Sequence, residues 1–300
     1  MTATILDGKA IAKTMQTEID VLVGRFKEET GVTPTIAVVR AGEDPGSVWY
    51  ANAIKKTMAA RGMEAQLHVL PETASQDELV AMVSGLNADP GVHGIMVQEP
   101  MPKGIDEAAV KAALSPDKDV DGVHEVNAGR LAMVAPAGRP PGVGPFFVPA
   151  TPAGGMELLR RHGIGFNGKN AVVVGRSNIV GKPMALLLMR ENATVTVCHS
   201  RSADLAGICR QADILCVAVG RAEMVRGDWI KPGAVVVDFG VNDVEGKMVG
   251  DVAYGEAIET AGMLTPVPGG TGPMTNVLLC LNLLEAARRQ VVRSRGRGWK

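Results

Sequence analysis

The chain has 300 residues, of which 46% are hydrophobic, 21% charged and only 3% aromatic, with 36 glycines and a formal net charge of −1. This length favours about two domains, and an aliphatic, glycine-rich composition is typical of α/β enzymes. The near-neutral charge excludes a global field that would recruit nucleic acid or an anionic membrane, so neither is expected as a partner.

The four cysteines are expected to be thiols, not metal ligands or disulfides. None belongs to a C-x-x-C pair and none has a histidine at ligand spacing, so no metal site is expected. Cys198 and Cys216 lie within apolar runs and should be buried and inert. Residues 1–8 lack a basic region followed by an apolar run, and no apolar segment reaches about 18 residues, so neither a signal peptide nor a membrane span is expected. The expected location is the cytoplasm.

Apolar residues recur with a helical period over residues 9–27, and apolar runs then alternate with helical patterns. Strands are predicted at 35–40, 66–70, 94–98, 171–174, 194–198, 213–220, 234–240 and 263–265. Helices are predicted at 47–61, 75–87 (with a capping box of Ser75 and Glu78), 105–114, 151–162, 204–211 and 276–290. This alternation indicates an α/β fold with right-handed crossovers. Residues 135–149, rich in proline and glycine, are predicted to form a linker or surface loop.

The segment 171–183, AVVVGRSNIVGKP, predicts a buried strand, a tight turn at Gly175 and a helix that begins near Gly181. A helix N-terminus that follows such a turn offers free N–H groups and a positive dipole end to a phosphate. The spacing of the two glycines matches the dinucleotide fingerprint only approximately.

The strand after the glycine turn favours NADP over NAD as cofactor. An acid normally follows this strand in NAD-binding domains, where it binds the ribose 2′-hydroxyl. Here the strand ends in His199, Ser200 and Arg201, whose hydroxyl and guanidinium groups suit a 2′-phosphate. Arg176 in the turn adds a second cation. The alternative is that Arg176 and Arg201 are solvated loop residues.

Three side chains in the N-terminal half are candidates for catalysis and substrate binding. Gln98 and Asp121 lie at or just past the ends of apolar runs, where open α/β sheets place their ligand sites. Tyr50 lies on the helix that follows the loop of residues 41–46. The alternatives are a turn-forming role for Asp121 and a packing role for Tyr50.

Five motifs together resemble the bifunctional methylenetetrahydrofolate dehydrogenase/cyclohydrolase (FolD) family. They are D-K-D-V-D-G (117–122), N-A-G-R-L (127–131), V-V-G-R-S-N-I-V-G-K-P (173–183), K-P-G-A-V-V-V-D-F-G-V-N (231–242) and T-P-V-P-G-G-T-G-P-M-T (265–275). The likeness covers nearly the whole chain in the family's order, and the last motif is very specific.

The resemblance implies a two-domain α/β protein that acts in one-carbon metabolism. A catalytic domain at residues 1–146 would be completed by the C-terminal helix 273–300. A Rossmann-type NADP-binding domain with a parallel sheet would occupy 147–272, with tetrahydrofolate derivatives in the cleft between the domains and a homodimer as the assembly. The first reaction passes a hydride from 5,10-methylenetetrahydrofolate to NADP. The second hydrolyses the methenyl product to 10-formyltetrahydrofolate.

Individual residues can be matched to the family's functional positions. Tyr50 matches the tyrosine that stacks near the pterin, Gln98 and Pro100 belong to the V-Q-L-P motif, and Asp121 matches the pterin-binding aspartate. The folate site would also include Pro268, Gly269 and Gly272, and the cofactor contacts would include Gly175, Arg176, Ser177 and Val241, beside Ser200 and Arg201.

The sequence also departs from the family pattern, most importantly at residue 54. The family helix reads Y-x-x-x-K, and its lysine is the acid–base residue of the hydrolytic step, but Ile54 stands here. Lys55 and Lys56 point elsewhere, because each residue turns the helix by about 100°. Glu99 replaces the leucine of V-Q-L-P, Ala150 replaces the cysteine of P-C-T-P, and the linker before it is longer than the family's.

The resemblance therefore predicts a dehydrogenase whose cyclohydrolase step is weak or absent. Loss of a general acid–base group costs about 10²–10⁴-fold in rate, whereas hydride transfer depends mainly on positioning. Two alternatives stay open: a fully bifunctional enzyme that recruits another group, and a regulatory pseudoenzyme that binds folate and NADP without turnover.

Overall fold

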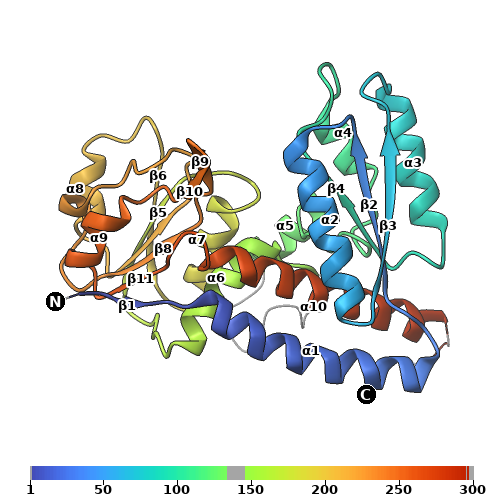
Figure 1. The fold of residues 1–300 in the computed structure, drawn as a ribbon, viewed down its shortest axis with the longest axis horizontal. Coiled ribbons are helices and arrows are strands. Elements are labelled where there is room, and N and C mark those ends of the chain that lie inside the picture. The colour runs from blue at the N-terminus through green and yellow to red at the C-terminus, as the bar shows by residue number, and fades with distance from the viewer. Residues whose placement is uncertain (1, 134–145, 295, 297–300) are drawn as a thin grey trace. The chain divides into compact units, whose positions relative to one another are not determined.

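The computed structural model describes residues 2–133, 146–294 and 296. It divides into two compact units, whose main segments are Met15–Arg130 and Pro149–Leu278 (Figure 1). The segment up to Thr14 belongs with the second of these units, and the segment from Leu279 belongs with the first. Most of the predicted linker, residues 135–145, lies outside the described residues.

The unit that contains Met15–Arg130 is built on a parallel sheet of three strands in the order β3-β2-β4. Its strands are β2 (Thr35–Ala41), β3 (Glu64–Leu70) and β4 (Gly94–Val97), and its main helices are α2 (Pro45–Ala60), α3 (Gln76–Ala88), α4 (Glu107–Ala112) and α5 (Glu125–Met133). The central strand β2 is buried on both faces over residues 35–39, as expected of an unbroken apolar run. Side chains of the sheet, α3 and α4 form one core, which includes Val39, Leu79 and Val110.

The N-termini of α2 and α3 show how local sequence sets these helices. The capping box of α3 is confirmed: Ser75 Oγ accepts from Glu78 N at 3.2 Å, and Glu78 Oε2 accepts from Ser75 N at 2.8 Å. The prediction that the next helix upstream begins at Ser47 was wrong by two residues. Asp44 is the N-cap and accepts from Ser47 N at 2.8 Å, and Pro45 begins the helix, where no partner for an N–H is needed.

The unit that contains Pro149–Leu278 is built on a parallel sheet of six strands in the order β1-β11-β8-β7-β5-β6. Its strands are β1 (Thr4–Ile5), β5 (Asn170–Val174), β6 (Thr194–Cys198), β7 (Ile214–Val217), β8 (Val235–Asp238) and β11 (Met263–Leu264). Its helices include α6 (Ala150–Arg161), α7 (Gly181–Arg190), α8 (Leu205–Cys209) and α9 (Tyr254–Thr260). Val174, Leu215 and Val236 belong to the same buried core. The expected two-domain α/β fold with a parallel sheet is confirmed.

Several elements were not predicted. They are β1, α5, α9 and the antiparallel hairpin of β9 (Asn242–Val244) and β10 (Lys247–Val249). The last helix, α10 (Thr271–Ser294), begins five residues before the predicted start at residue 276. Pro273 is tolerated there because the first turn of a helix leaves its N–H groups without intrahelical partners. The long helices α1 (Gly8–Thr30) and α10 have residues in both units.

All four cysteines are buried, as predicted for Cys198 and Cys216. Burial raises the pKa of the Cys216 and Cys280 thiols to about 12, which keeps them protonated and unreactive at neutral pH. Over the described part of the chain, no helix combines the length and apolarity needed to cross a bilayer.

Candidate active site

The glycine turn after β5 has the geometry of a phosphate-binding turn. Gly175 has a φ of +125°, and a Cβ placed on it would lie 2.1 Å from the carbonyl oxygen of Ala218. A Cβ on Gly181 would lie 2.3 Å from the carbonyl oxygen of Gly175. Neither position can carry a side chain without displacing the backbone. The two glycines therefore let the turn fold tightly onto the N-terminus of α7.

Ser177 closes the same turn. Its Oγ accepts from Val180 N at 3.1 Å and from Gly181 N at 3.2 Å, so the hydroxyl caps α7 through its lone pairs. The O–H of the hydroxyl remains the donor that an anion at this turn would use. The predicted cofactor residue is thus also a structural residue of the turn.

The residues predicted to bind a 2′-phosphate follow the carboxyl ends of two neighbouring strands, β5 and β6. Val174 pairs with Cys198, so the chain leaves β5 and β6 at neighbouring points, just before Arg176 and Ser200 respectively. Arg176, Ser200 and Arg201 are all exposed. The turn after β6 is closed by two bonds, from His199 N to Ser202 Oγ at 3.0 Å and from Arg201 N to His199 Nδ1 at 3.2 Å.

Val241 and the P-V-P-G-G segment follow two other strands at this edge. Val241 comes three residues after β8 and is 59% exposed. Gly269 accepts from Lys9 N at 3.1 Å, and a Cβ on Gly8 would lie 1.7 Å from the carbonyl oxygen of Gly270, so the segment is fixed to the start of α1. Pro268 precedes this contact, and Gly272 lies in the first turn of α10. The structure therefore brings this predicted set together at the carboxyl ends of parallel strands.

In the other unit, Gln98 follows β4 and is buried. Its backbone N–H donates to Val39 O at 2.8 Å, which extends the pairing of β4 with β2. Its side-chain amide oxygen and nitrogen, by contrast, find no hydrogen-bond partner among the described residues. A buried amide without partners costs free energy, so this side chain is poised for a polar ligand.

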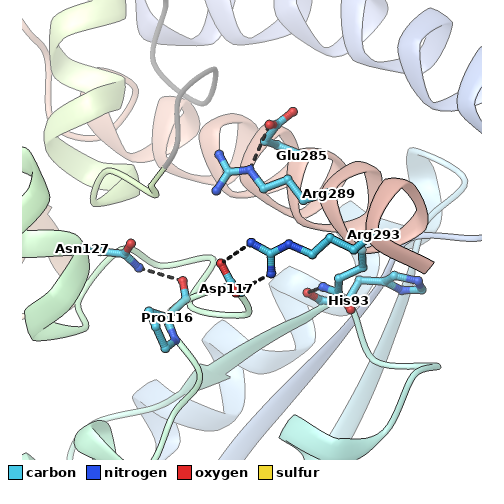
Figure 2. Close-up of polar contacts among 8 residues, drawn as sticks. His93, Pro116, Asp117, Asn127, Glu285, Arg289 and Arg293 are labelled. Carbon is cyan, nitrogen blue, oxygen red and sulfur yellow. Dashed lines mark hydrogen bonds and ion pairs between the residues drawn. The ribbon is translucent and has the colours of Figure 1, made fainter. Parts of the chain in front are cut away.

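The three aspartates of D-K-D-V-D-G have different surroundings. Asp117 forms an ion pair with Arg293 of α10 (Figure 2). Asp119 is fully buried and accepts from His124 N and Asn127 Nδ2, each at 2.8 Å. Asp121 is half-buried, and burial together with the nearby charges of Asp119 and Glu99 raises its pKa to about 7, against the opposing effect of Lys111.

The loop that carries Asp121 is held by the C-terminal helix. Asn282 of α10 donates through Nδ2 to Val120 O at 2.8 Å and to Val148 O at 3.2 Å. Further along the helix, Gln290 Nε2 donates to His93 O at 2.7 Å. The helix thus holds the backbone carbonyl of Val120, the residue directly before Asp121.

Tyr50 and Ile54 lie four residues apart on α2 and so share one face of the helix. Burial raises the pKa of the Tyr50 hydroxyl above its usual range, and the charge of Asp121 adds to this effect. Ile54 is only 1% exposed, whereas Lys55 and Lys56 are exposed, as the helical geometry predicted. No lysine therefore replaces residue 54 from this helix.

Glu99 is neutralised by a residue that the sequence analysis missed. Its carboxylate forms an ion pair with Lys111 on α4, and its carbonyl oxygen accepts from Ser47 Oγ at 3.1 Å. Pro100 follows as an exposed residue. The only sequence signal for this pair would have been a lysine on the helix that follows the unusual glutamate. The described residues contain no group of three or more histidines, cysteines or acids that could hold a metal.

Comparisons with known proteins agree with this geometry. Residues 6–121 match the tetrahydrofolate dehydrogenase/cyclohydrolase catalytic domain, and residues 149–291 match the NAD(P)-binding domain of the same family. The chain is 51% identical over 299 residues to the bifunctional protein FolD of a Caulobacter species, with 96% of this chain and 97% of that protein covered.

Solved structures of the family have the same fold. The bifunctional FolD enzyme of Campylobacter jejuni is 39% identical, with a TM-score of 0.90 over 96% of this chain and 99% of that one. The Trypanosoma brucei enzyme, solved with NADP and an inhibitor, is 38% identical, with a TM-score of 0.90 over 97% and 99% of the two chains. The chain belongs to the tetrahydrofolate dehydrogenase/cyclohydrolase (FolD) family.

Proposed function

We propose that this protein oxidises 5,10-methylenetetrahydrofolate to the methenyl form with NADP, and that its cyclohydrolase step is weak or absent. The observation that carries this proposal is a contrast within the unit that contains Met15–Arg130, which we call the catalytic unit. Two polar side chains support the binding of a pterin: Gln98, whose buried amide has no hydrogen-bond partner among the described residues, and Asp121. The position on α2 that matches the family's acid–base lysine is occupied by a buried isoleucine, Ile54.

The two reactions place different demands on the protein. Oxidation removes a hydride, with its electron pair, from the bridge carbon and leaves the methenyl cation, so the protein's task is to hold donor and acceptor in line. Hydrolysis adds water to that carbon, releases a proton and must protonate a ring nitrogen as the carbon–nitrogen bond breaks. Ile54 can take no part in these proton transfers.

The proposed preference for NADP rests on the turns after β5 and β6. Arg176, Ser200 and Arg201 are exposed at one edge of the sheet, and no acid stands where NAD-binding domains place one. A guanidinium and a hydroxyl can bind the 2′-phosphate by charge-assisted hydrogen bonds.

Arg201→Asp is therefore expected to raise the KM for NADP by about 10–100-fold, because it replaces an attractive charge with a repulsive one. The KM for NAD should stay within about threefold, since NAD lacks the phosphate. The matched control is Lys169→Asp, which makes the same charge change directly before β5, at the opposite end of the sheet. Equal losses with both cofactors would contradict the assignment of Arg201.

The decisive experiment supplies the purified protein with each folate in turn. NADP-dependent oxidation of methylenetetrahydrofolate without enzyme-dependent hydrolysis of methenyltetrahydrofolate would support the proposal. Efficient catalysis of both steps would show a fully bifunctional enzyme. Binding of folate and NADP without turnover would show a pseudoenzyme. No feature of the described residues supports that alternative.

We also propose that the chain forms a homodimer, as its resemblance to the family implies. Among the described strands, β6 is one of the two end strands of the six-stranded sheet, and its Val197 is 41% exposed. An end strand has unpaired backbone groups along its outer side, so it is suited to pair with a second copy. Sedimentation equilibrium at micromolar concentration tests the proposal, and a single species of one-chain mass would contradict it.

A further inference from the structure

Asp251 is a fully buried carboxylate that follows β10 in the unit that contains Pro149–Leu278. Its Oδ2 accepts from Val219 N at 2.6 Å and from Gly220 N at 3.0 Å. Its Oδ1 accepts from Arg221 N at 2.8 Å and from Asn242 Nδ2 at 3.0 Å. One side chain thus binds three consecutive backbone N–H groups after β7 and a side chain after β8.

A second buried carboxylate completes this arrangement. Asp238 Oδ1 accepts from Gly240 N at 2.8 Å and from Asp251 N at 3.1 Å, and its Oδ2 accepts from Val252 N at 2.9 Å. The carbonyl oxygen of Asp238 accepts from Thr271 Oγ1 at 3.1 Å. The two aspartates therefore join the ends of β7 and β8 to the segment after β10 and to the first residue of α10.

The backbone held in this way borders the glycine turn. The strands β5, β7 and β8 are neighbours in the sheet, so the segments after them lie side by side. Ala218, next to the residues bound by Asp251, presents the carbonyl oxygen against which Gly175 packs. Val241 lies between Gly240, held by Asp238, and Asn242, held by Asp251.

We propose that Asp251 is a positioning residue for the nucleotide cofactor: it fixes the segments after β7 and β8 against which the cofactor lies. The inference rests on the proposed use of NADP. It assigns no contact with the cofactor to Asp251, which acts only through the backbone of residues 219–221 and through Asn242.

The carboxylate is suited to this task because both of its oxygens accept. An asparagine has the same shape but presents an NH₂ group where two N–H donors or an N–H and an NH₂ now converge. In Asp251→Asn the new NH₂ group therefore faces other donors. The backbone of residues 219–221 or the side chain of Asn242 must then move, although the volume of residue 251 is unchanged.

The test compares NADPH binding, by fluorescence titration, and steady-state kinetics for the whole chain and its variants. Asp251→Asn is expected to raise the Kd for NADPH and the KM for NADP by about tenfold or more, the scale of a lost pair of charge-assisted bonds. The KM for methylenetetrahydrofolate should stay within about twofold, because no folate residue is held by this carboxylate.

The matched control is Asp213→Asn. Asp213 also accepts from a backbone N–H, that of Asn170 at 2.9 Å, and pairs with Lys231, but it does so at the amino ends of β5 and β7. Its variant should lower the melting temperature without changing NADPH binding. Asn242→Ala removes one of the four hydrogen bonds to Asp251 and adds no new donor, so it should weaken NADPH binding by roughly two- to fivefold. This variant provides the test if Asp251→Asn does not fold.

Unchanged NADPH binding in folded Asp251→Asn and in Asn242→Ala would overturn the inference. An equal rise in the KM for folate would also overturn it, since that would show a general loss of structure. Absence of NADPH binding by the unmodified chain would instead overturn the proposed cofactor, so the two failures can be told apart.

Discussion

Ile54→Lys is expected to raise the rate of methenyltetrahydrofolate hydrolysis by about 10²-fold or more. The new ammonium group would lie one helical turn after Tyr50, the side chain whose pKa the charge of Asp121 helps to raise. It would supply the proton transfers that an isoleucine cannot. Oxidation of methylenetetrahydrofolate should change by less than about threefold, because hydride transfer uses no proton from this position. The two rates are measured on one preparation.

The same substitution should lower the melting temperature, because Ile54 is fully buried and the ammonium group must be desolvated unless it pairs with Asp121. Ile54→Met, which is unbranched like lysine, one atom shorter and uncharged, is the control and should leave hydrolysis unchanged. A folded Ile54→Lys protein that hydrolyses no faster than the control would show that residue 54 is not the acid–base position.

Asp121→Asn is expected to lower kcat/KM for methylenetetrahydrofolate by about 10²-fold, because a carboxylate accepts two N–H donors of a pterin and an amide accepts only one. Above pH 7 the variant should be at least as thermally stable as the unmodified protein. Burial raises the pKa of Asp121 from 3.8 to about 7, so this side chain costs stability progressively between these pH values and in full above pH 7, and asparagine removes the penalty. Loss of activity with retained stability separates a binding role from a structural one.

The same ionisation sets the expected pH profile. The ionised form of Asp121 is the acceptor, so kcat/KM for the folate should rise as pH increases through about 7 and then level off. Lys111→Met removes a charge that favours ionisation and should shift the profile to higher pH. Glu99→Gln removes a charge that opposes it and should shift the profile to lower pH. Shifts of the same sign in both variants would contradict this account.

The parts of the site that the sequence predicted correctly depend on local chemistry. The unbroken apolar runs of β4 and β5, the turn at Gly175 and the capping box at Ser75 each involve residues that are close in the chain. The placing of Gln98 and Asp121 at strand or loop ends followed from the same runs. The roles of these residues in substrate binding came from the resemblance and stay predictions.

The parts that were missed depend on contacts between distant segments. β1 has two residues, too few for a periodic signal, and exists because β11, near the other end of the chain, pairs with it. The partner of Glu99 lies 12 residues away on another element. Asp251 is one aspartate among many in the sequence, and its importance follows only from the four donors that the fold brings to it.

The C-terminal helix has a consequence for how the protein is made. Its Asn282, Gln290 and Arg293 bind residues 120, 93 and 117, which precede them by 162, 197 and 176 positions. Figure 2 shows the last of these contacts, between Arg293 and Asp117. A ribosome has synthesised the whole sheet of the catalytic unit long before these three side chains exist. That unit therefore completes its folding only after α10 has left the ribosome. A fragment that stops after the first half of the chain would lack the supports of its own aspartate loop.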